Sequence, residues 1–144
     1  VGSEMCIRDS VWCKETTYPS CQKDYDYDND PTYGQCAITA TLVYDLFGGT
    51  IHKLKVNGGG THYFNKINGH YIDLTSDQFD LYDIPLEYVP NEVVPREYCE
   101  KNADTKRRYQ LLVDFVNKWT LKHKIKRQAS ILFLNFYCLH LISL

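Results

Sequence analysis

The stretch TYGQCAITATLVYDLFGG, residues 32–49, places one cysteine between a Gly-Gln pair and an apolar repeat. Residues 35–47 have the spacing of a mostly buried helix. The side chains on its broad apolar face are Ala37, Ala40, Val43, Tyr44 and Phe47. Gly48 and Gly49 follow, and glycine is preferred just after a helix C-terminus. The stretch therefore predicts a helix over 35–47 with Cys36 in its first turn.

Cys36 has two interpretations. Free cysteine is often a small buried hydrophobe, so one interpretation is a packed thiol. The other is a nucleophile, because the unpaired N–H groups at a helix N-terminus favour a negative sulfur. A neighbouring imidazole, oriented by a carboxylate or an amide, would complete that activation.

A predicted sheet downstream supplies both groups. A strand over 50–56 and a glycine-rich turn precede two strands, 61–67 and 70–74, which meet at Asn68-Gly69. Asn-Gly is a strong signal for a type I′ hairpin turn, which fixes the register of the two strands.

In that register Ile67 lies opposite His70, and His62 and Asp73 are diagonal neighbours on one face. Such neighbours are about 7–8 Å apart at the backbone, within reach of a carboxylate and an imidazole. His70 points to the other face. The spacing therefore permits a Cys36–His62–Asp73 triad, in which His62 is the base and Asp73 orients it. The competing interpretations are a packed strand histidine and a carboxylate that bonds the backbone near Thr75.

Four further residues are candidates near this triad. Gly34 would let the backbone approach a substrate closely. The Gln35 amide and the backbone N–H of Cys36 would form an oxyanion hole. Asn65 would either support the turn or assist the site through its amide, and Tyr63 would line a substrate groove.

The remaining segments are expected to be structural. Residues 12–31 predict an irregular segment wrapped on the domain, and three prolines mark a connector before a helix over about 105–119, capped by Asp104 or Thr105. Asp24, Asp26 and Asp28 have calcium-loop spacing, but the following positions lack the required Gly and Glu. We therefore expect no metal and no cofactor.

Composition and the chain ends bound the function. With 144 residues the chain predicts one domain, 11–119, and a net charge of −2 gives no basic face for nucleic acid. Six scattered cysteines without a C-x-x-C pair indicate a reducing, cytoplasmic location.

At the ends of the chain, residues 1–10 suggest a non-native or disordered leader. Residues 120–144 are a basic, then apolar tail, whose apolar part is shorter than the about 20 residues that span a bilayer. A membrane anchor is the weaker interpretation of this tail, and a docked or non-native end is favoured; the oligomeric state is left open.

Two motif blocks, YGQCAITATLVYDLFGG and GGTHYFNKINGHYIDLT, resemble the small bacterial YunG-like family. More remotely, the Cys helix followed by a strand His and an Asp resembles transglutaminase-like cysteine enzymes. That resemblance implies a papain-like α+β fold, a nucleophile helix packed on a small antiparallel sheet, with Cys36, His62 and Asp73 as the triad. The chain departs from those enzymes in its short Cys-to-His interval and in having Tyr63 where they have tryptophan.

These observations predict a thiol hydrolase or acyltransferase that acts on an amide or thioester carbonyl. The expected partner is a peptide or a small-molecule amide. The alternative is a non-catalytic binding module on a papain-like scaffold, in which Gln35, Tyr63 and the acidic loop line a groove.

Overall fold

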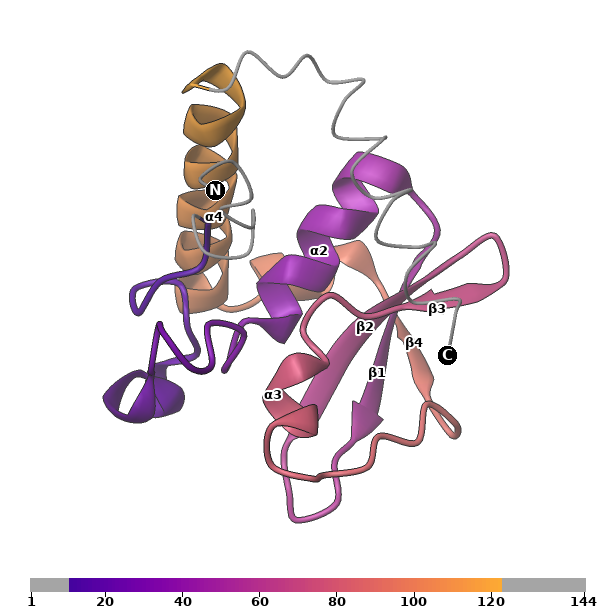
Figure 1. Ribbon diagram of the computed structural model, residues 1–144. Helices are drawn as coiled ribbons and strands as arrows, with labels where there is room; N and C mark the ends of the chain where they lie inside the picture. The colour runs from indigo at the N-terminus through magenta and orange to yellow at the C-terminus, as the bar shows by residue number, and fades with distance from the viewer. Residues whose placement is uncertain (1–10, 123–144) are drawn as a thin grey trace, which may run out of the picture.

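The computed structural model describes residues 11–122, so the predictions for the leader 1–10 and for the apolar tail lie outside the described residues. The described chain has nine elements, which are labelled in Figure 1. They are η1 (Pro19–Asp24), α2 (Cys36–Phe47), β1 (Thr50–Lys55), β2 (Thr61–Ile67), β3 (His70–Ile72), α3 (Asp77–Asp80), β4 (Glu92–Val94), η2 (Arg96–Glu100) and α4 (Ala103–Lys122).

The four strands form one antiparallel sheet in the order β3-β2-β1-β4. Ile67 pairs with His70, which confirms the predicted hairpin register. β3 ends at Ile72, two residues earlier than predicted. The chain turns there because the Asp73 carboxylate accepts the N–H of Thr75, a local bond that competes with strand pairing. β4, a strand too short to show an alternating pattern, was not predicted.

Helix α2 lies between the sheet and α4 (Figure 1). One of its sides packs on the sheet, where Ala40 meets Ile51 and Tyr63. Another side, around Ile38, packs against Leu112 of α4. The prediction of a mostly buried helix is therefore confirmed, and the fold is α+β with helices on a small antiparallel sheet.

Helix α4 begins earlier and ends later than predicted. The side chain of Asn102 caps it, because its Oδ1 accepts the N–H groups of Asp104 and Thr105. The predicted caps, Asp104 and Thr105, are wrong for this reason. Asp104 instead accepts hydrogen bonds from Arg107 and Arg108.

The segment before α2 is wrapped on the domain, as predicted. Trp12 is buried and donates from Nε1 to Thr39 Oγ1 at 3.0 Å. The fully buried Arg108 donates to the carbonyl of Thr16.

Asp26 of the acidic loop accepts hydrogen bonds from Asn29 of its own turn. Within residues 11–122, no group of three or more His, Cys, Asp or Glu side chains is arranged to hold a metal ion.

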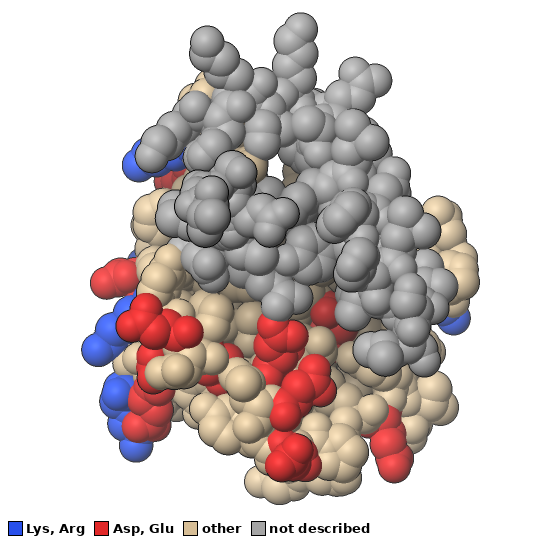
Figure 2. Space-filling model, viewed as in Figure 1, with Lys and Arg blue, Asp and Glu red and all other residues tan. Residues whose placement is uncertain are grey.

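On the face seen in Figure 2, Asp and Glu side chains are spread over the lower half, and Lys and Arg lie at the margin. The described part of that face has no concentrated basic surface of the kind that binds phosphate groups. No helix in the described part of the chain is both long and apolar enough to cross a membrane.

Candidate active site

The turn before α2 sets the position of Cys36. Gly34 has φ +70°, and a Cβ there would lie 2.9 Å from Thr17 Oγ1 and 3.0 Å from the backbone nitrogen of Tyr18. Its carbonyl accepts the Tyr18 N–H. The chain's own packing therefore requires glycine here, and the close approach of a substrate at this turn stays a prediction.

Cys36 is the first residue of α2 and has a free, half-buried thiol. No described residue accepts a hydrogen bond from its backbone N–H. Orphan N–H groups of this kind carry the positive end of the helix dipole. The position therefore suits a negative charge on the sulfur or on an oxygen bound beside it.

His62 and Asp73 are in direct contact, as the hairpin register predicted. His62 Nε2 lies 2.6 Å from Asp73 Oδ2, and the His62 side chain is fully buried. The ring of Phe79 meets the imidazole edge-on with centroids 4.6 Å apart, and Phe64 stacks beside it at 6.3 Å. The imidazole is thus held in one orientation by a carboxylate and two rings.

Asp73 combines the two interpretations made from the sequence. Its Oδ1 accepts from the backbone N–H of Thr75 at 3.0 Å and lies 3.2 Å from the Thr75 hydroxyl. Its Oδ2 accepts from the Tyr88 hydroxyl at 2.9 Å besides contacting His62. The same carboxylate closes a local turn and orients the imidazole.

The remaining nitrogen of His62, Nδ1, is buried and makes no hydrogen bond within residues 11–122. Burial lowers the His62 pKa, but the hydrogen bond and charge of Asp73 and the nearby Cys36 oppose it and raise the pKa to about 9. Since Asp73 occupies Nε2, Nδ1 is the nitrogen of His62 that is left for a further partner. At neutral pH this arrangement favours the imidazolium form of His62.

Gln78 joins the two halves of the site, and the sequence analysis missed it. Its Oε1 accepts the Gly34 N–H at 3.3 Å, and its Nε2 donates to the Thr75 carbonyl at 2.7 Å. The turn that carries Cys36 is thereby tied to the turn that follows Asp73. A lone glutamine in a short helix gives no sequence signal for such a role.

Three predicted neighbours lie elsewhere. The Gln35 side chain is fully buried and donates to the Cys13 carbonyl at 3.0 Å, so it anchors the N-terminal segment. Asn65 donates to the Ala40 carbonyl of α2 at 2.9 Å, on the face opposite His62, since the two residues are an odd number apart. Tyr63 is 8% exposed and packs on Tyr98, so it lies in the core rather than in a groove.

A second buried histidine lies on the same sheet face, although its sequence neighbours offered no partner. His52 Nε2 is 2.7 Å from Thr50 Oγ1, and its Nδ1 is 2.7 Å from Asn91 Oδ1. It stacks on Phe64, its partner across the β1–β2 pair, with centroids 5.7 Å apart. Its partners are neutral, whereas the partner of His62 is a carboxylate.

Comparison with known proteins places the chain in a family. A family model described as YunG protein matches residues 5–122. The chain belongs to the YunG family. Over 75 residues this YunG-family chain is 41% identical to a Bacillus subtilis (strain 168) protein named "Uncharacterized protein YunG", covering 52% of the chain and 59% of that protein. The chain thus spans less than two thirds of this relative's length. No solved structure matches it.

Proposed function

We propose that this chain is a cysteine-dependent hydrolase or acyltransferase that acts on an amide or thioester carbonyl. The observation that carries the proposal is the buried His62–Asp73 contact of 2.6 Å, together with the influence of Cys36 on the same imidazole. A carboxylate that orients a histidine beside a thiol is the arrangement that activates cysteine nucleophiles.

In the proposed reaction the Cys36 sulfur attacks the carbonyl carbon, and a C–S bond forms. The C–N bond of an amide, or the original C–S bond of a thioester, then breaks, and His62 gives its proton to the departing group. Water or an amine attacks the acyl-enzyme, returns a proton to His62 and releases Cys36. The backbone N–H of Cys36 would stabilise the oxyanion.

The fold supports a papain-like interpretation. A helix that begins with the candidate nucleophile packs on an antiparallel sheet, whose neighbouring strands β2 and β3 lead to His62 and Asp73 in that order. The described cysteines Cys13, Cys21, Cys36 and Cys99 are free, as a cytoplasmic location would require.

A non-catalytic binding module is the second candidate. His62 is fully buried, and the cleft of about 330 Å³ beside β1 is lined by none of the three triad residues. Both features suit a scaffold on which the triad holds the fold together and ligands bind elsewhere.

The test is the rate at which iodoacetamide modifies Cys36, resolved by mass spectrometry between pH 5 and 9. We expect Cys36 to react at pH 6–7 faster than Cys21, which is also half-buried, and His62→Ala to slow it about tenfold or more. His52→Ala is the matched control, since it removes the other buried histidine of the same sheet face. Equal Cys36 rates in the wild type and in His62→Ala would refute the catalytic proposal and favour the binding module.

A further inference from the structure

The sheet ends unevenly at β1. On one side β1 pairs with β2 as far as Lys55, opposite Thr61. On the other side it pairs with β4 only as far as Lys53, opposite Glu92. Continuing that register would place Pro90 opposite Lys55, and proline has no N–H to donate.

This leaves one set of backbone groups without a strand partner. The Val56 N–H donates to the Gly60 carbonyl across the turn, on the β2 side. Because backbone groups alternate in direction along a strand, the N–H and C=O of Lys55 face the β4 side. The β1–β4 pairing ends at Lys53, so neither group has a partner in β4, and neither bonds the backbone of a described turn or loop. An edge of this kind accepts an extended chain.

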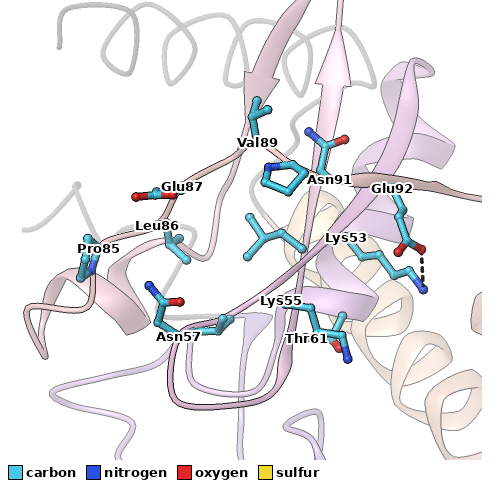
Figure 3. A pocket seen from close by; sticks show the side chains of 13 residues that line it. Lys53, Lys55, Asn57, Thr61, Pro85, Leu86, Glu87, Val89, Asn91 and Glu92 are labelled. Atoms are coloured by element: carbon cyan, nitrogen blue, oxygen red, sulfur yellow. Dashed lines mark ion pairs between the residues drawn. The ribbon is translucent and has the colours of Figure 1, made fainter.

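A cleft of about 330 Å³ opens beside this edge (Figure 3). The ends of β1 and β2 form one wall, and the connector from Pro85 to Asn91 forms the other. Six apolar residues line it, Leu54, Val56, Pro85, Leu86, Val89 and Pro90. The volume lies at the lower end of the range of ligand pockets.

The charges on the two walls are opposite. Lys53 and Glu92 pair with each other at 3.1 Å at one end of the cleft. Lys55 on the strand wall and Glu87 on the connector wall have no ion-pair partner among the described residues. A ligand with an acidic group at one end and a basic group at the other complements both walls.

We propose that this cleft binds an extended peptide segment that takes the place where β4 stops. One peptide residue pairs with the Lys55 backbone. The next residue, on the side away from β4, lies opposite Val56 and points its side chain toward Val56 and Leu86, because side chains alternate between faces. The ligand is therefore a peptide with an apolar residue flanked by opposite charges.

The proposal goes beyond the proposed reaction, because binding here requires nothing of Cys36. The cleft does lie next to the candidate site, since Leu54 pairs with His62 and Thr61 precedes it. A peptide held on β1 would lie one strand away from the imidazole.

The test measures binding of two labelled pentapeptides, acetyl-Asp-Thr-Leu-Thr-Lys-amide and the reverse order, to the Cys36→Ala protein by fluorescence anisotropy. We expect at least one of these two peptides to bind saturably. Replacing its Leu by Gly should weaken binding about tenfold or more, and N-methylation of its Thr residues should weaken it about fivefold or more. The Lys55 amide resonance should shift on binding.

Leu86→Asp is expected to weaken binding at least tenfold. Leu81→Asp is the matched control, directly after α3, at a side chain that is 55% exposed outside the cleft. The proposal is overturned if neither peptide binds, if both leucine variants have the same effect, or if N-methylation changes nothing. Peptide binding is measured on the Cys36→Ala protein, so a failure to bind peptide does not affect the alkylation test of the proposed reaction. A negative alkylation result likewise does not affect the binding test.

Discussion

Two buried histidines stack on Phe64, one from across the β1–β2 pair and one from two residues along β2, but their surroundings differ. Both are on the sheet face opposite α2, and both rings stack on Phe64. His52 meets an amide and a hydroxyl, which bring no charge. His62 meets the Asp73 carboxylate, and Cys36 acts on the same ring. A buried imidazole is thus structural or chemically poised according to the charge of its partner.

Asn91 and Asp73 show how each partner is itself held. The Asn91 amide nitrogen donates to the Tyr88 carbonyl and to the Tyr71 hydroxyl. The Tyr88 hydroxyl donates in turn to Asp73. The connector after α3 therefore supplies a partner to both histidine environments, and a chain of hydrogen bonds runs between them.

The largest expected effect comes from Asp73→Asn, which makes the surroundings of His62 like those of His52. The pKa of His62 should fall from about 9 toward the usual value of about 6.5, since burial is then opposed only by Cys36. Cys36 alkylation at pH 7 should slow about tenfold or more, and the free energy of unfolding should fall by on the order of 3 kcal/mol. NMR titration and urea unfolding measure these changes. Asp45→Asn, which removes a carboxylate paired with Arg96 away from the site, should leave the alkylation rate unchanged.

The second prediction concerns the pH dependence of stability. The pKa of His62 in the folded protein, about 9, lies above its value in the unfolded chain. The stabilising contribution of His62 to the free energy of unfolding is therefore complete below about pH 6.5 and is lost as the pH rises through 9. The free energy of unfolding should therefore fall by on the order of 2–3 kcal/mol more in the wild type than in Asp73→Asn between pH 6 and 10. Urea unfolding across this range tests it. An equal fall in both proteins would show that His62 is not the group responsible.

The reverse exchange, Asn91→Asp, gives His52 a carboxylate. The NMR signals of the His52 ring protons should then move, because a charged partner replaces a neutral one beside the ring. The loss of the amide donor to Tyr88 and Tyr71 should cost on the order of 1–2 kcal/mol of unfolding free energy. The rate of Cys36 alkylation should stay within about twofold of the wild-type rate, because a charge beside His52 is too far from the thiol to affect it strongly. A large change there would show that the two histidines are coupled.

The smallest effect is expected from Tyr88→Phe, which removes one hydrogen bond to Asp73 Oδ2 and keeps the ring against Phe64. The free energy of unfolding should fall by about 1 kcal/mol. Tyr71→Phe, at a more exposed hydroxyl that accepts from Asn91, should cost less. If both variants are equally stable, the Tyr88 hydroxyl does not support the carboxylate.

The triad candidates could be derived from the amino-acid sequence because local chemistry specifies them. Asn68-Gly69 forms a tight turn whatever surrounds it, and the two-residue period of strands then brings His62 and Asp73 to one face. The helix of Cys36 likewise follows from its apolar period and its terminal glycines. These features depend on residues within a few positions of one another.

The partners of the buried polar groups could not be derived in this way. Gln35 bonds Cys13, Asn65 bonds Ala40, and Tyr88 bonds Asp73. Each group must find a hydrogen bond once it leaves water, but its partner is whichever group long-range packing brings beside it. Residue type and spacing thus placed the candidate site in the chain, and the packing of distant segments determined the contacts around each of its side chains.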